Sequence, residues 1–313
     1  MSYSLEEQVV ILPLDNIGRK DRFLEKIFLL IDGIAFSSLI LALTGGFGIY
    51  ASYYIEGVPW LPASGILLIL VSFSVYNLNR KTDEQEDEIN HRERFSFTKK
   101  YKKLLFYAAV VSYAAALSIG FFYGMRAFFV TCIPLLSGIL YSEPVLPVSW
   151  KYKRLKEIPV VKNVLVAGAW ALTLALLPIS MNPAGPGIRI LISGLFFFTY
   201  VFMASVLPDI RDREGDATVG ITTLPVLVGN RTTNLILVAV TSVLGGAIVL
   251  TGSRYAPAGI ILLLVTGISY MMFCILSMER LIRTNIVCDY LADGGFIFFG
   301  LVTLLFTLSG IAR

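Results

Sequence analysis

Charged residues are scarce in this chain, and their scarcity excludes an ordinary soluble domain. Asp, Glu, Lys and Arg make up 15% of the 313 residues, whereas a soluble globular domain carries about 25%. Hydrophobic residues make up 56%, and the mean hydropathy is +0.74. Apolar stretches of about 20 residues, the length that crosses a bilayer core, recur along the whole chain. The composition therefore predicts an all-α, polytopic membrane protein with a single membrane-embedded domain over residues 1–313.

Histidine and cysteine are too few and too scattered for a zinc or iron–sulfur site. His91 is the only histidine, and Cys132, Cys274 and Cys288 lie in or beside apolar runs without paired spacing. The net charge is +4, but the basic residues lie in short connections and form no amphipathic or aromatic-laced patch. The sequence thus argues against both a zinc or iron–sulfur centre and a nucleic-acid partner.

Nine apolar stretches predict nine transmembrane helices. They lie at residues 23–43, 61–78, 104–122, 128–140, 160–177, 188–207, 235–250, 258–278 and 289–308. The fourth stretch is shorter than the roughly 17 to 25 residues that a crossing needs, so its ends must extend into the flanking segments.

The basic residues orient these spans, because cytoplasmic connections retain Lys and Arg. Of the 26 basic residues, 22 fall in the N-terminal segment and in the connections after spans 2, 4, 6 and 8, which leaves four for the other side. This alternation predicts a cytoplasmic N-terminal segment at residues 1–20. It also places the connections at residues 79–103 and 208–232 in the cytoplasm.

Two clusters of oxygen-bearing side chains follow spans 2 and 6. The spacing is i, i+4, i+8 in the first cluster and i, i+3, i+7 in the second, and either spacing puts three side chains on one face of a helix. The clusters are Asn79, Asp83 and Asp87, and Asp209, Asp212 and Asp216. Carboxylates repel one another unless cations lie between them, and Mg²⁺ prefers carboxylate, water and phosphate oxygens. Two clusters at one membrane face favour a magnesium-held diphosphate over a solvated acidic loop.

Basic side chains near the clusters are candidate ligands for an anionic substrate. The candidates are Arg22, Arg94, Lys156, Lys162 and Arg211. The two lysines follow the segment Gly-Ile-Leu-Tyr-Ser-Glu-Pro at the end of span 4, which contains Tyr141. Each basic residue can instead mark the cytoplasmic face, and Tyr141 can serve as an interfacial aromatic anchor.

These residues resemble the UbiA superfamily of intramembrane prenyltransferases. The segment Asp209–Gly229, DIRDREGDATVGITTLPVLVG, is similar to the second aspartate motif of that family and to the G-x-x-T-L-P that follows it. The first cluster matches NxxxDxxxD, and weaker matches are Leu-Tyr-Ser at Tyr141 and the pair Lys162 and Asn163. With nine predicted spans, the resemblance covers nearly the whole chain.

The resemblance implies nine transmembrane helices around a central cavity. It also implies Mg²⁺-dependent transfer of a prenyl group from a polyprenyl diphosphate, such as geranylgeranyl diphosphate, to an aromatic or lipid acceptor in the membrane, with release of diphosphate. Quinone precursors, haem, chlorophyll-type rings and glycerol-phosphate lipids all remain open as acceptors.

The resemblance also implies roles for individual residues. Two Mg²⁺ ions would be held by Asn79, Asp83, Asp87, Asp209, Asp212 and Asp216. Catalytic roles fall to Asp83, Asp87, Asp212, Asp216, Lys156 and Tyr141. The diphosphate would be bound by Asn79, Arg22, Arg94, Lys156, Lys162, Asn163 and Arg211.

Two other functions compete with prenyl transfer. A membrane alcohol phosphotransferase also uses aspartates and a metal, but its usual DGxxAR opening is absent from this sequence. A transporter would place polar residues near the bilayer midplane, whereas both clusters here lie at span ends on one side.

The orientation can be tested by cysteine labelling. In a cysteine-free variant, single cysteines at Ser96 and Ser149 are expected to react with an impermeant reagent from the cytoplasm, and cysteines at Gly57 and Ser253 from outside. The opposite pattern would overturn the orientation derived from the basic residues.

Overall fold

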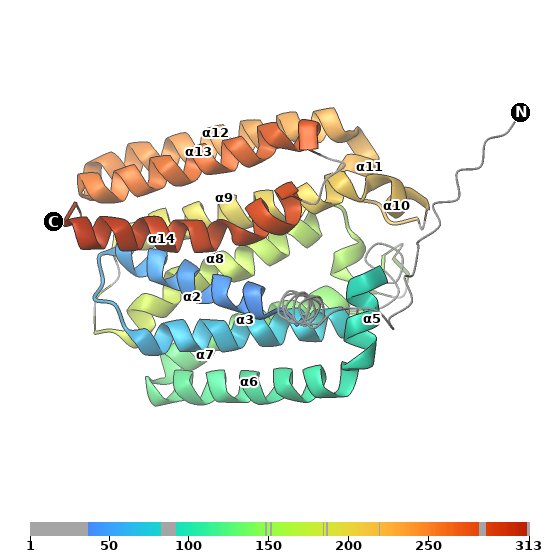
Figure 1. Ribbon diagram of the computed structural model, residues 1–313, viewed down its shortest axis with the longest axis horizontal. Helices are drawn as coiled ribbons and strands as arrows, with labels where there is room; N and C mark the ends of the chain where they lie inside the picture. The colour runs from blue at the N-terminus through green and yellow to red at the C-terminus, as the bar shows by residue number, and fades with distance from the viewer. Residues whose placement is uncertain are drawn as a thin grey trace, which may run out of the picture.

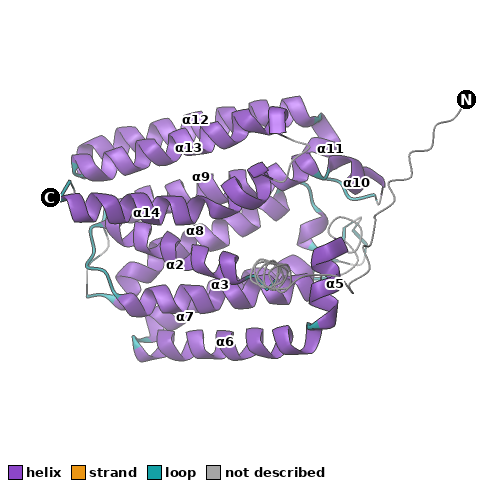
Figure 2. Ribbon diagram, viewed as in Figure 1, coloured by secondary structure: helices purple, strands orange, loops and turns teal. Residues whose placement is uncertain are grey.

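The computed structural model describes residues 37–82, 92–147, 149–150, 152–183, 185, 187–218, 220–281 and 286–311. Within these ranges every regular element is a helix (Figure 2). The long helices are α2 (Leu39–Glu56), α3 (Pro62–Thr82), α6 (Lys102–Phe122), α7 (Met125–Ser142), α8 (Val161–Met181), α9 (Ile188–Arg211), α12 (Asn230–Tyr255), α13 (Ala258–Leu281) and α14 (Asp293–Ser309). The short ones are α5 (Arg92–Lys100), η2 (Leu155–Glu157), α10 (Arg213–Thr218), α11 (Leu224–Val228) and the π-helix η3 (Ile286–Ala292).

Eight helices in the described part of the chain are long and apolar enough to cross a membrane. They are α3, α6, α7, α8, α9, α12, α13 and α14 with the end of η3. Each coincides with one of the predicted spans, and most extend a few residues beyond the predicted ends. The all-α, membrane-spanning architecture is therefore confirmed.

The first predicted span differs most from the structure. Residues 23–36 lie outside the described part, and α2 continues to Glu56, well past the predicted end at Leu43. The glycines that follow Leu43 interrupt the apolar run, but they lie inside the helix. α2 is a further long helix that is not among the eight candidate spans, so the count of nine spans stays a prediction.

Glycines in α2 allow its close approach to neighbouring helices. A Cβ added at Gly45 would lie 2.2 Å from Ser72 Oγ and 2.7 Å from the Leu68 carbonyl oxygen, both on α3. One added at Gly48 would lie 3.3 Å from the Phe296 ring on α14. α2 is capped at its C-terminal end by Gly57 with φ 69°, a conformation that favours glycine.

α3 and α9 end at the same end of the bundle (Figure 1). The short helices α5, α10 and α11 lie there, and the C-terminus lies at the opposite end. We call this the motif end, because both predicted acidic clusters follow from these two helices. Much of the predicted connections is helical, since α5 lies within residues 79–103 and α10 and α11 within residues 208–232.

The tight contact between α2 and α3 predicts a sharp difference between two glycine variants. Gly45→Ala forces its Cβ against α3 backbone and is expected to lower the free energy of unfolding by about 1–3 kcal/mol. Gly246→Ala on α12 meets no atom within 4 Å and is expected to be neutral or to stabilise by up to about 1 kcal/mol. Thermal midpoints in detergent compare the two, and equal midpoints would refute the packing of α2.

Candidate active site

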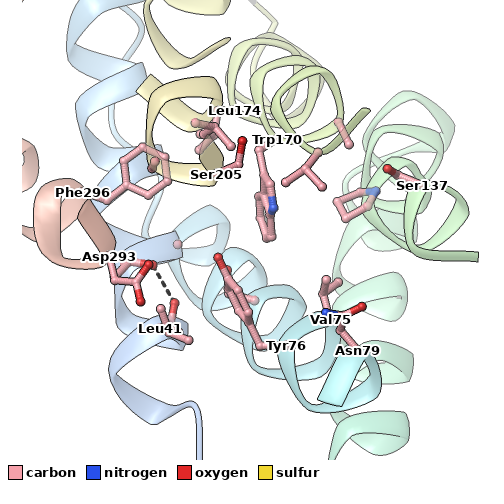
Figure 3. Close-up of a pocket in the computed structure, with 18 of the residues that line it drawn as sticks. Leu41, Val75, Tyr76, Asn79, Ser137, Trp170, Leu174, Ser205, Asp293 and Phe296 are labelled. Carbon is pink, nitrogen blue, oxygen red and sulfur yellow. Dashed lines mark hydrogen bonds between the residues drawn. The ribbon is translucent and has the colours of Figure 1, made fainter. Parts of the chain in front are cut away.

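A cavity of about 290 Å³ lies between α2, α3, α7, α8, α9 and α14 (Figure 3). Most of its wall is apolar, with the rings of Tyr76, Trp170 and Phe296 facing the space. The polar side chains on the wall include Asn79, Ser137, Tyr141, Ser205 and Asp293. Asn79 and Tyr141, both predicted from the sequence, thus reach one cavity from α3 and α7. A second hollow of about 140 Å³ shares part of this wall and continues between α3 and α7.

The second acidic cluster begins in the last turn of α9, where Asp209 is buried. Lys162 Nζ donates to Asp209 Oδ1 at 2.7 Å, and Asn163 Nδ2 donates to Asp209 Oδ2 at 3.2 Å. Asn163 also donates to the Ser205 carbonyl oxygen at 3.0 Å, and Ser205 lines the cavity. Three residues predicted to form the site are therefore in direct contact at the motif end, one turn from the cavity wall.

The backbone before α8 is strained where it presents this lysine. Val160 has φ 66°, although β-branched residues rarely adopt positive φ. Such a conformation costs of order 1–3 kcal/mol and persists only where the surroundings impose it. Lys162 and Asn163 follow in the first turn of α8, directly after this residue.

Two further carboxylates continue the cluster beyond α9. Arg211 contacts Asp212 through Nε and Nη2, at 2.8 Å and 3.0 Å from the two carboxylate oxygens. Asp216 on α10 is buried, and burial raises its pKa to about 6. The charge of Lys162 opposes this rise, while the negative charges of Asp209 and Asp212 add to it. The cluster therefore holds more negative charge than its lysine neutralises.

Lys156 is buried in η2, in the connection between α7 and α8. The turn is fixed by Glu157, which accepts hydrogen bonds from the Lys153 backbone N–H at 2.8 Å and from Arg154 Nε at 2.7 Å. η2 contacts both α7 and α8, so Lys156 is held between the helices that carry Tyr141 and Lys162.

Four predicted site residues cannot be placed. Arg22, Asp83 and Asp87 lie outside the described residues, and so does the side chain of Arg94. Of the first cluster, Asn79 is placed, on the last turns of α3 and on the cavity wall. How the two clusters face each other therefore stays a prediction.

The described residues fit magnesium through oxygen ligands. No group of three His, Cys, Asp or Glu side chains in the described part could hold a metal ion. Mg²⁺ does not need such a group, because it is commonly bound by one or two carboxylates together with substrate phosphates. The buried Asn163 Oδ1 has no hydrogen-bond partner, and burial, together with the nearby carboxylates of Asp209 and Asp212, raises the pKa of Asp216. A cation bound at the cluster would give the Asn163 oxygen a partner and would offset the negative charge around Asp216.

The model of the UbiA prenyltransferase family matches residues 34–284, which include both acidic clusters and most of the cavity wall. The chain belongs to the UbiA prenyltransferase family. It is accordingly a prenyltransferase and an integral, multi-pass membrane protein. Among the residues matched by the family model are all those placed above except Asp293 and Phe296.

Known UbiA relatives agree with this assignment. Digeranylgeranylglyceryl phosphate synthase of Pyrococcus furiosus is 28% identical over 200 residues, which are 62% of this chain and 66% of that protein. A UbiA homolog from Archaeoglobus fulgidus bound to GPP and Mg²⁺ has a TM-score of 0.60 at 15% identity, over 90% of this chain and 99% of its own. The apo UbiA homolog from Aeropyrum pernix K1 has a TM-score of 0.64 at 13% identity, over 85% and 98%. The two structures establish a shared fold.

The ion pair at the motif end predicts a double-variant effect. Lys162→Met leaves the Asp209 carboxylate buried without its cation and is expected to cost about 3–5 kcal/mol of unfolding free energy. Adding Asp209→Asn removes the uncompensated charge and should restore most of that loss. Thermal midpoints in magnesium-free detergent measure both, with Lys103→Met on the exposed side of α6 as the control. If the double variant is no more stable than the single one, the pair does not hold this site together.

Proposed function

We propose that this enzyme transfers an isoprenoid chain from a polyprenyl diphosphate, such as geranylgeranyl diphosphate, to a hydroxyl group of a glyceryl phosphate lipid. The reaction takes place inside the membrane, needs Mg²⁺ and releases diphosphate. The observation that carries the proposal is the junction between a buried cluster of acids and lysine at the motif end and the largely apolar cavity next to it.

The cluster binds the diphosphate end of the donor. Asp209, Asp212 and Asp216, with Asn79 on the cavity wall, are the described members of the proposed set that holds two Mg²⁺ ions. Bound magnesium neutralises the diphosphate and stabilises the charge that collects on it as it leaves. Lys162 already lies in the cluster and adds a cation at the same place. We place this end of the protein, with its connections, on the cytoplasmic side, as the basic residues predict.

The cavity protects the reactive part of the donor. When the carbon–oxygen bond to the diphosphate breaks, the prenyl chain carries an allylic cation that water would destroy. The rings of Tyr76, Trp170 and Phe296 face the space, and aromatic ring faces attract cations. The apolar wall therefore keeps water out while the rings stabilise the developing positive charge.

The choice of acceptor is supported by the Pyrococcus furiosus relative, whose name describes a glyceryl phosphate lipid with two geranylgeranyl chains. A lipid acceptor also suits the hollow between α3 and α7 that adjoins the cavity, since a second apolar chain needs room beside the donor. An aromatic acceptor of the quinone-precursor type is the alternative, and the same assay distinguishes it.

The proposal predicts a contrast between two neighbouring acids. Asp212→Asn is expected to lower Mg²⁺-dependent diphosphate release from geranylgeranyl diphosphate and lipid acceptor by about 100-fold, because it removes an electrostatic stabiliser of the transition state. Glu214→Gln changes an exposed carboxylate on α10 and should leave the rate within about twofold. EDTA should abolish release by the wild type. Equal rates in the two variants would remove the second cluster from the active site.

A further inference from the structure

Asp293 is a carboxylate inside a membrane span that belongs to neither acidic cluster. It lies in the first turn of α14, within the candidate span Tyr290–Ser309, and it lines the cavity. Ionisable residues within spans are costly and face a functional site far more often than lipid. Figure 3 shows the Asp293 carboxylate and the Tyr76 hydroxyl reaching the same part of the cavity, beside Phe296.

A π-helix fixes the position of this carboxylate. η3 ends at Ala292, directly before Asp293, and π-helical turns occur frequently at functional sites. Two tyrosines hold the last carbonyl groups of η3: the Tyr270 hydroxyl on α13 donates to the Leu291 oxygen at 2.7 Å, and the Tyr200 hydroxyl on α9 donates to the Ala292 oxygen. The start of α14 is thereby fastened to two neighbouring helices.

Aromatic packing holds the two tyrosine rings in place. The Tyr200 ring lies 4.9 Å from the Phe299 ring, and the Tyr270 ring stacks on Phe298 at 4.5 Å. Gly295 lies against Tyr200, where an added Cβ would overlap the ring and the hydroxyl group. Asp293 therefore follows a well-fixed turn, and its place on the cavity wall is set by the contacts of its neighbours Ala292 and Gly295 with Tyr200.

Asp293 lies deeper in the membrane than the second acidic cluster. Tyr200, which contacts the Ala292 that precedes Asp293, lies nine residues before Asp209 on α9, or about 13.5 Å of helix rise. Tyr76 precedes Asn79 on α3 by three residues, or about 4.5 Å. The carboxylate thus lies farther from the motif end than the proposed metal ligands, in the part of the cavity where the prenyl chain and the acceptor must meet.

We propose that Asp293 takes the proton of the acceptor hydroxyl during prenyl transfer, an inference that rests on the proposed function. The bond between the first prenyl carbon and the diphosphate oxygen breaks, and its electron pair leaves with the diphosphate. A lone pair of the acceptor oxygen forms the new carbon–oxygen bond, and the hydroxyl proton passes to the Asp293 carboxylate. After the diphosphate and the lipid ether leave, the proton passes to water at the motif end.

The test compares proton acceptance with the steps that precede it. Asp293→Asn keeps the shape of the side chain but cannot take the proton, so transfer to the lipid hydroxyl is expected to fall by about 10²–10⁴-fold. Donor ionisation should persist, measured without acceptor as migration of ¹⁸O from the bridging to the non-bridging position of labelled geranylgeranyl diphosphate. Donor binding should also persist, measured as Mg²⁺-dependent thermal stabilisation by a prenyl thiodiphosphate.

A second variant and a control complete the design. Asp293→Ala opens a space for a small carboxylate, and added formate should restore part of its transfer activity. Glu279→Gln changes an exposed carboxylate near the end of α13 and should keep wild-type transfer.

Three results would overturn the inference. Transfer by Asp293→Asn within threefold of wild type would show that no proton passes to this group. Loss of donor binding or isotope migration together with transfer would assign Asp293 to the donor site or to the fold. Isotope migration by the wild type without transfer to any acceptor hydroxyl would refute the proposed function, and the proton acceptor with it.

Discussion

The ion pair between Lys162 and Asp209 connects the start of α8 to the end of α9, at the point where the second acidic cluster begins. A carboxylate buried to this degree needs a cation or hydrogen bonds, and Lys162 and Asn163 supply both. Asn163 also donates to the carbonyl oxygen of Ser205, one turn earlier on α9, where that helix lines the cavity. Asn163 thus links Asp209 of the second acidic cluster to Ser205 on the cavity wall.

The motif end is charged, whereas the cavity next to it is largely apolar. At the motif end, negative charge is concentrated around Asp216 and awaits cations, which suits an anionic leaving group. Farther from that end, aromatic rings and an apolar wall suit a carbocation and a hydrocarbon chain. Asp293 is the exception, an acid on the apolar side, and its place depends on two tyrosine hydroxyls that hold the π-helix before it. The same helix bundle thereby offers one environment for the negative charge of the leaving group and another for the positive charge of the prenyl chain.

The sequence predicts the spans well, because hydrophobic length is a local property, whereas the second cluster as a metal site stays a prediction from acid spacing. Eight spans, Asn79, Tyr141, Lys162 and Asp209 lie where those patterns indicate. The extent of α2 is missed because its glycines interrupt the apolar run, and only the contact with α3 shows why they belong in a helix. Asp293 is missed although an acid within an apolar stretch, four residues after the Asp289 that begins it, is a usable signal. Trp170 and Ser205 carry no such signal, since their position on the wall depends on which faces of α8 and α9 meet the cavity.

Mass spectrometry of reaction products tests prenyl transfer to a lipid most directly. Purified protein would be incubated with geranylgeranyl diphosphate, Mg²⁺ and equal amounts of two acceptors, a prenylated glyceryl phosphate with a free hydroxyl and a phenolic quinone precursor. We expect a single new product, the glyceryl phosphate carrying one additional geranylgeranyl ether, which is absent when EDTA replaces Mg²⁺. Prenylation of the phenolic acceptor alone would contradict the lipid assignment. Recovery of both acceptors unchanged from protein that binds the donor would contradict prenyl transfer to either class.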